Sequence, residues 1–135
     1  MLLQIGVKVI IKNATGQLLF LKRKEQFLLP GNPDEAWDIP GGRIETEEHL
    51  NDALLREVKE EIGTNLSGMP KLINAQDIFV PQKDLHVVRL TYTLDSEIKN
   101  ITLSDEHTDY RWVSLAESKE LNVEPFLRAT LDLLK

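Results

Sequence analysis

The sequence lacks cysteine, contains no long apolar run and carries no excess of positive charge. Without cysteine the chain can form neither disulfides nor thiolate metal sites, which fits a reducing compartment. No stretch approaches the ~18 consecutive apolar residues of a membrane-spanning helix. The N-terminal segment MLLQIGVKVIIK is interrupted by Gln4 and Lys8, and it lacks the basic start and unbroken apolar core of a signal peptide. We therefore expect a cytoplasmic protein without a membrane span.

The net charge of −6 excludes a general attraction for nucleic acid or for anionic membranes. A protein of this charge that binds phosphates must attract them locally, through a cation or a few basic residues. A chain of 135 residues has the length of one ordinary domain, and its hydrophobic fraction of 41% is sufficient for a core. No repeat, linker or low-complexity tract divides it, so we expect a single domain over residues 1–135.

Apolar patterning predicts a mixture of strands and helices. The expected strands are residues 3–11, 18–21, 71–80, 85–94 and 110–113. Turn residues 13–16 join the first two strands as a hairpin. The expected helices are 47–62, ended by Gly63, and a last one that starts near Pro125. The connections are a polar loop at 22–36, a short extended piece at 37–40, a sharp turn at Gly41–Gly42 and a polar loop at 102–109. Without a regular βαβ rhythm, this order predicts an α/β fold of the α+β type, with helices packed on a mixed sheet.

The helix expected at 47–62 carries carboxylates on the side that faces the core. At ~100° per residue, an apolar arc is formed by Leu50, Leu54, Val58 and Ile62. Glu61 falls within this arc and Glu57 lies beside it, whereas Glu60 lies at its edge. We therefore expect Glu57 and Glu61 to point inward and Glu60 to flank them.

Inward carboxylates need a compensating positive charge. Residues at i and i+4 repel each other when both are acidic, and burial makes the repulsion and the desolvation worse. A solvated helix face accounts for other acids of the region, namely Glu45, Glu47 and Asp52. Arg56 could supply the charge, but it points about 100° away from Glu57. Clustered carboxylates without thiols or paired histidines favour a hard cation with oxygen ligands, Mg²⁺ or Mn²⁺, which would also bridge to substrate phosphates.

The segment GGRIETEEHLNDALLREVKEEIGT resembles the Nudix box, G-x5-E-x7-R-E-U-x-E-E-x-G-U, in which U is aliphatic. The positions in register are Gly42, Glu48, Arg56, Glu57, Val58, Glu60, Glu61 and Gly63. Thr64 departs from the usual aliphatic residue at the last position, which carries no chemistry. So many specified positions at fixed spacing are a strong signal. The resemblance to MutT-like members also covers Lys22-Arg23, the Trp37–Pro40 segment and the Glu106…Trp112 spacing, and so runs from residue 3 to about 113.

The resemblance implies a fold, a reaction and a set of site residues. The fold is an α/β/α sandwich around a mixed sheet, and the reaction is hydrolysis of a nucleoside diphosphate linked to another group X. The implied metal ligands are Glu57, Glu60, Glu61 and the backbone carbonyl of Gly41, with Glu48 supporting the metal or its waters. Arg56 would belong to the catalytic set by orienting a neighbouring glutamate. Arg23 matches a phosphate-contacting arginine.

A second acid is expected across the cleft. Glu106 stands six residues before Trp112, and in MutT-like members an acid at this spacing approaches the metals. The competing interpretation is a surface acid, and Asp105 and Asp109 are alternatives to Glu106. His107 is expected to be a loop residue rather than a catalyst.

The reaction requires water to attack phosphorus in a substrate that is already anionic. Metal ions neutralise phosphate oxygens and lower the pKa of bound water. A glutamate then accepts the proton of that water. Glu57 and Glu106 are both candidates for this general base, because members of the family place the base differently.

The expected activity is Mg²⁺-dependent hydrolysis of a nucleoside di- or triphosphate derivative, most simply a nucleoside triphosphate, with release of the monophosphate. ADP-ribose and nucleotide sugars are alternative substrates. A non-catalytic nucleotide-binding module is a weaker alternative, because such relatives generally lose acids of the box and none is lost here. A relative of isopentenyl-diphosphate isomerase is set aside, since that enzyme usually needs a cysteine. Dimers are common in the family, so a homodimer is an open expectation.

Overall fold

The computed structural model describes residues 1–24 and 36–135, so most of the polar loop expected at 22–36 lies outside the described residues. The strands are β1 (Leu2–Lys12), β2 (Leu18–Arg23), β3 (Trp37–Asp38), β4 (Gly41–Arg43), β5 (Lys71–Val80), β6 (Leu85–Asp95) and β7 (His107–Val113). The helices are α1 (Leu50–Ile62), α2 (Leu115–Ser118) and α3 (Pro125–Leu131), and η2 (Pro81–Lys83) is a single 3₁₀ turn. No helix in this described part is long and apolar enough to cross a membrane.

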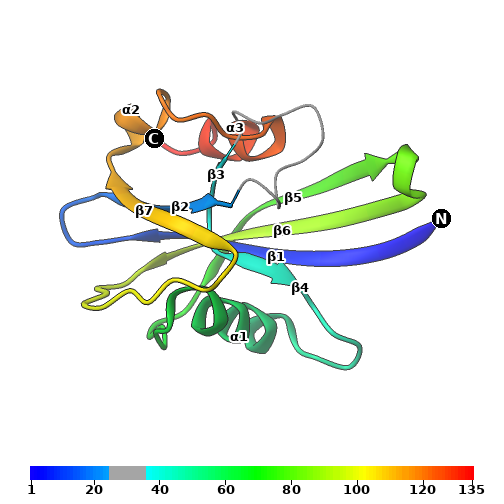
Figure 1. Ribbon diagram of the computed structural model, residues 1–135, viewed down its shortest axis with the longest axis horizontal. Helices are drawn as coiled ribbons and strands as arrows, with labels where there is room; N and C mark the ends of the chain where they lie inside the picture. The colour runs from blue at the N-terminus through cyan, green and yellow to red at the C-terminus, as the bar shows by residue number, and fades with distance from the viewer. Residues whose placement is uncertain (25–35) are drawn as a thin grey trace.

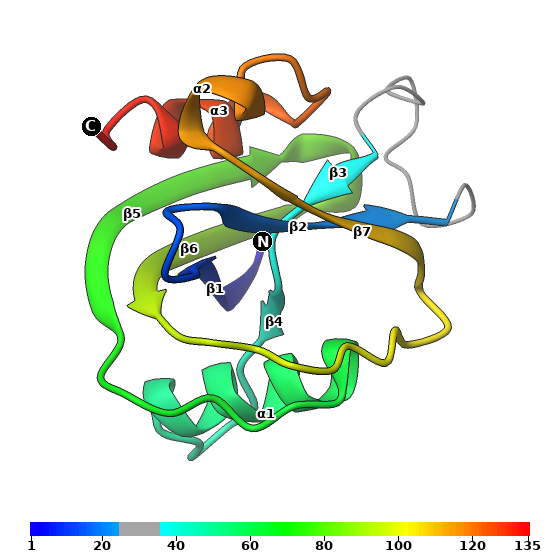
Figure 2. The same ribbon diagram turned by 90° about the vertical axis from the view of Figure 1, so that its left-hand side faces the viewer.

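The strands form one mixed sheet with helices on both faces. Its order is β3-β2-β1-β6-β5, with β4 paired to β1 and β7 paired to β2. The β1 and β6 strands run parallel over their whole length, and the other strand pairs are antiparallel. Figure 2 shows α1 below the sheet and α2 with α3 above it. The expected α/β/α arrangement around a mixed sheet is thus confirmed.

The hairpin expected from the first two strands exists only at its turn. Strands β1 and β2 pair at Lys12 and Leu18, and β2 then leaves β1 to pair with β3 and β7. The edge that β2 leaves is taken by β4, which pairs with β1 from Gly6 to Lys8 (Figure 1). Gly41 of β4 and His107 of β7 line one cavity, and the candidate site lies there.

A separate apolar core covers each face of the sheet. The core under α1 contains Val7, Val9, Ile11, Leu19, Leu21, Ala53, Leu54, Val58, Ile62, Tyr92 and Leu94. The core under α2 and α3 contains Ile10, Leu18, Phe20, Ile39, Val113, Leu121, Val123, Leu127 and Leu131. The description of 3–11 as a half-buried strand is therefore incomplete: its second half is buried on both faces, while Leu2 and Leu3 are exposed.

Helix α1 begins at Leu50, three residues later than predicted. Glu47 has a positive φ of 68° and His49 is extended, so the chain turns before the helix starts. The end is as predicted, because Gly63 adopts the left-handed conformation, with φ 72°, and its amide donates to the carbonyl of Lys59. The buried apolar face places the intervening carboxylates against β4.

Other elements were predicted wrongly or missed. The segment at Gly41–Gly42 is part of strand β4 rather than a sharp turn. Strand β7 begins at His107 rather than Tyr110, because its ladder with β2 extends to the pair Arg23–His107. Helix α2 was not predicted, although Ser114 and Glu117 form a capping box at its start.

Candidate active site

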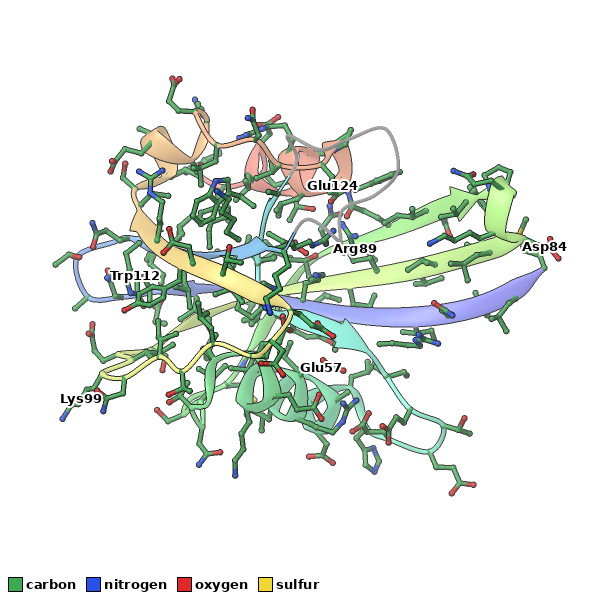
Figure 3. All side chains as sticks on the ribbon, in the orientation of Figure 1. Glu57, Asp84, Arg89, Lys99, Trp112 and Glu124 are labelled. Atoms are coloured by element: carbon green, nitrogen blue, oxygen red, sulfur yellow. The ribbon has the colours of Figure 1, made fainter. Side chains whose placement is uncertain are left out.

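The inward face of α1 carries its glutamates at graded depths. The side chain of Glu61 is 9% exposed and that of Glu57 is 15% exposed, whereas that of Glu60 is 58% exposed. In Figure 3, Glu57 lies on the side of α1 that faces the sheet. The helical wheel therefore ranked the three carboxylates correctly.

Glu61 is held by the backbone of β4. Its Oε1 accepts a hydrogen bond from the amide of Gly41 at 2.8 Å, and its Oε2 lies 3.5 Å from Nε2 of His107. Burial raises the pKa of Glu61 to about 8, even though the charge of Lys8 and the Gly41 amide both favour the ionised form. The buried carboxylate is therefore short of positive charge in this arrangement.

Glu57 packs against Gly42, which is the first specified glycine of the segment that resembles the Nudix box. A Cβ atom at Gly42 would lie 2.4 Å from both Cδ and Oε2 of Glu57. Only a residue without a side chain therefore leaves room for the carboxylate. Burial raises the pKa of Glu57, and the hydrogen bond and charge of Arg56 oppose this shift.

We expect Gly42→Ala to lower kcat by about 100-fold, because displacement of a reacting group by ~1 Å costs on this order. The new methyl group meets the end of a flexible side chain, so Glu57 moves and the backbone remains folded. Initial rates and a melting curve of the variant test this. A wild-type kcat would contradict it, and so would a kcat loss that merely follows unfolding.

Arg56 joins several acids of the box through one guanidinium group. It makes a bidentate pair with Glu48, at 2.7 and 2.9 Å, and its Nη1 donates to Glu57 at 2.9 Å and to Glu60 at 3.3 Å. Its hydrogen bonds lower the pKa of Glu48 to about 2. The expectation that Arg56 points away from Glu57 is wrong, because the long side chain bends back to reach it.

Of the acids of α1, Glu61 lines a cavity of about 210 Å³, whereas Glu57 and Glu60 are not part of its lining. Its lining is formed by Lys8, Arg23, Asp38, Gly41, Glu61, Glu106 and His107. The lining thus includes Glu106, the acid expected across the cleft, while its alternatives Asp105 and Asp109 are absent from it. Arg23, the expected phosphate contact, also lines this cavity.

His107 is a buried strand residue, so its description as a loop residue is wrong. It starts β7 and is 7% exposed. Burial lowers its pKa to about 4, so the imidazole is neutral at pH 7, and Oγ of Ser104 lies 3.4 Å from its Nδ1. The sequence signal that could have placed it is the full β2–β7 register, which cannot be read from β7 alone.

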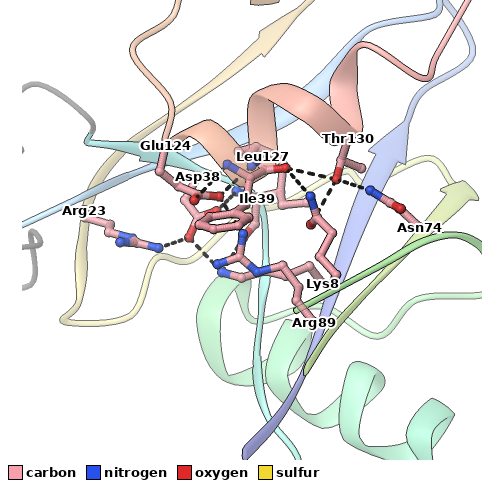
Figure 4. A network of polar contacts seen from close by, with 11 residues as sticks. Lys8, Arg23, Asp38, Ile39, Asn74, Arg89, Glu124, Leu127 and Thr130 are labelled. Carbon is pink, nitrogen blue, oxygen red and sulfur yellow. Dashed lines mark hydrogen bonds and ion pairs between the residues drawn. The ribbon is translucent and has the colours of Figure 1, made fainter. Parts of the chain in front are cut away.

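Sequence reasoning also missed a charged cluster around Asp38, which is 4% exposed. Asp38 Oδ2 accepts hydrogen bonds from Nζ of Lys8 at 2.7 Å and from Nη2 of Arg23, and its Oδ1 accepts from the amide of Ile39 at 2.8 Å (Figure 4). Burial opposes ionisation, but the charges of Lys8 and Arg23 prevail and hold the pKa of Asp38 well below its usual range. The cluster fixes two cations at the cavity.

The donor chemistry of the site suits a hard cation. Carboxylates and backbone carbonyls are available, without any thiol. Within residues 1–24 and 36–135, however, no three acids or histidines converge closely enough to hold an ion, since Arg56 engages Glu48, Glu57 and Glu60. Glu61, by contrast, has no hydrogen-bonded cation in the described part of the chain. A cation beside Glu61 would supply the missing positive charge.

Known proteins are similar to this chain over nearly its whole length. A family model described as the NUDIX domain matches residues 2–134. The nucleoside triphosphatase NudI of Salmonella schwarzengrund (strain CVM19633) is 30% identical over 132 residues, covering 92% of this chain and 91% of the relative. NudI of Klebsiella pneumoniae (strain 342) is 26% identical over 130 residues, covering 90% and 89%.

Solved structures show the same fold. The MutT protein from Methanosarcina mazei Go1 superposes with a TM-score of 0.81 at 26% identity, covering 96% of this chain and 91% of that one. A MutT NUDIX hydrolase from Burkholderia pseudomallei gives a TM-score of 0.81 at 22% identity over both full chains, which shows the likeness of fold. Enzymes of this family typically use a divalent metal. This chain belongs to the Nudix family of pyrophosphohydrolases.

Proposed function

We propose that this chain, as a single domain over residues 1–135, is a Mg²⁺-dependent pyrophosphohydrolase that acts on nucleoside triphosphates and releases the monophosphate. The observation that carries the proposal is the cavity that joins Glu61 and Glu106, from opposite sides, to Arg23 and Lys8. Such a site offers oxygen ligands for a cation and positive charge for phosphates. The relatives at 30% and 26% identity are described as nucleoside triphosphatases, which supports this substrate class.

In this proposal Glu57, Glu60, Glu61 and the carbonyl of Gly41 would hold Mg²⁺, and Glu48 would support it. When bound, the ion would neutralise phosphate oxygens and lower the pKa of a water molecule. Arg56 acts through the glutamates that it holds.

The contacts of the two candidate acids favour one of them as the general base. Glu57 is bonded to Arg56 and would also hold the metal ion, so its carboxylate is already engaged. Glu106 lines the cavity and makes no ion pair within the described residues. We therefore assign Glu106 as the base that accepts a proton from water, and Arg23 as a contact for substrate phosphate.

A substrate panel tests the proposed function. Ribo- and deoxyribonucleoside triphosphates, ADP-ribose and a nucleotide sugar are each incubated with Mg²⁺, with Mn²⁺ or with EDTA. We expect the highest kcat/KM with a triphosphate and no turnover in EDTA. Preference for ADP-ribose or the sugar would contradict the substrate class. Ligands that raise the melting temperature but are never hydrolysed would indicate a binding module instead.

A further inference from the structure

Lys8 lines two cavities. The first is the cavity that contains Glu61 and Glu106, and the second, of about 170 Å³, is lined by Gly42, Arg43 and Arg89 among others. The consecutive residues Gly41 and Gly42 line one cavity each, whereas Lys8 lines both. A ligand that extends from the glutamates into the second cavity therefore passes the Lys8 side chain.

The ammonium group of Lys8 is fixed in this position. Its Nζ donates to Oδ2 of Asp38 at 2.7 Å and lies 3.4 Å from the carbonyl oxygen of Ile39. The side chain is only 14% exposed, although it belongs to a strand whose neighbouring residues are apolar and buried. A buried lysine loses the hydration of its ammonium group, and this costs free energy unless an anion pairs with the charge.

The need to neutralise Asp38 does not by itself explain why a lysine is buried at position 8. Arg23 already forms an ion pair with the same carboxylate oxygen. Asp38 thus holds two cations with a single negative charge, and the cluster of Lys8, Arg23 and Asp38 carries a net charge of about +1 at the cavity. Glu61 and Glu106 line the same cavity, so these two cations attract an anion there once a bound metal ion offsets the two glutamates.

We propose that Lys8 is a second substrate-binding cation beside Arg23, that it contacts the phosphate chain between the two cavities, and that Asp38 positions both cations. The inference rests on the proposed function for the identity of its ligand, a polyphosphate. Figure 4 shows Lys8 and Arg23 at Asp38, where both form an ion pair with the same carboxylate oxygen.

Binding of inorganic tripolyphosphate in the presence of Mg²⁺, measured by calorimetry, tests Lys8 without requiring turnover. We expect Lys8→Met to weaken binding about tenfold, as the loss of one charge-assisted hydrogen bond implies. Lys12→Met is the matched control, since Lys12 lies on the same strand and lines neither cavity. It should bind as the wild type does. Lys8→Arg should retain most of the affinity.

Further variants separate binding from folding and positioning. Lys8→Met with Asp38→Asn keeps the net charge of the cluster at about +1 but removes the Lys8 ammonium group, so it should fold and bind as weakly as Lys8→Met. Asp38→Asn alone keeps both cations but should still weaken binding. With a nucleoside triphosphate, we expect Lys8→Met to raise KM about tenfold while kcat changes less than about threefold.

The possible outcomes distinguish this inference from the proposed function. Folded Lys8→Met protein with wild-type affinity and KM would overturn the role of Lys8 and leave the hydrolase intact. A wild type that does not bind tripolyphosphate would also overturn it. Tripolyphosphate binding that depends on Lys8, without any nucleotide hydrolysis, would support Lys8 and contradict the proposed function.

Discussion

Glu61→Gln is expected to lower kcat by about 1,000-fold or more. Glutamine has nearly the same shape and can still accept the hydrogen bond from the Gly41 amide, so the substitution removes mainly the charge. If Glu61 holds the cation, the loss is several kcal/mol of stabilisation, and each 1.36 kcal/mol is tenfold in rate. Initial rates at saturating Mg²⁺ and substrate measure this effect.

Substitutions at other acids of α1 show whether the loss of activity depends on the position of the carboxylate. Glu57→Gln should cause a loss of similar size, and Glu60→Gln a smaller one, because the Glu60 side chain is 58% exposed at the flank of the site. Asp52→Asn is the matched control, since Asp52 lies on the exposed side of the same helix and should leave the rate unchanged. Undiminished turnover in both Glu57→Gln and Glu61→Gln would rule out the proposed site.

The same Glu61→Gln substitution should stabilise the metal-free protein at alkaline pH. Burial raises the pKa of Glu61 to about 8 from its ordinary value of 4.5, so the folded state binds this proton more tightly than the unfolded state. Between these values stability falls as pH rises, and the loss is complete above the folded pKa. At 1.36 kcal/mol per pKa unit, a rise from 4.5 to about 8 corresponds to about 5 kcal/mol, most of which is lost between pH 5 and pH 8.5.

Urea unfolding in EDTA at pH 5 and at pH 8.5 measures this effect. The wild type should lose stability relative to Glu61→Gln across that window. If the free energy of unfolding depends on pH in the same way in both proteins, then folding does not raise the pKa of Glu61. This substitution should also remove the activity. A charged Glu61 would therefore be required for catalysis although it lowers the stability of the metal-free protein.

The part of the site carried by α1 could be predicted from sequence, because its spacing is local. A helix fixes the direction of each Cα–Cβ bond, so the wheel ranked Glu61, Glu57 and Glu60 correctly. It could not place the end of a long side chain. Arg56 therefore reaches Glu57 although its Cβ points elsewhere.

The other half of the site depends on pairings between distant residues. Strand β2 leaves the expected hairpin, and its register with β7 carries Arg23 to His107. Asp38 meets Lys8 across 30 residues of sequence. The apolar pattern within one strand does not show which distant residues it will contact. The roles of Lys8, Asp38 and His107 could therefore not be predicted from the sequence. Glu106 was found only through the resemblance to the family.

The central claim is that the acids of α1 support hydrolysis of a phosphoanhydride bond in a nucleoside triphosphate. The most direct test is ³¹P NMR of the products that the wild type forms with Mg²⁺, beside a matched Glu61→Gln sample. We expect nucleoside monophosphate and pyrophosphate from the wild type, and neither from the variant nor from a sample with EDTA. Release of nucleoside diphosphate and phosphate, or equal product formation by wild type and variant, would contradict the claim.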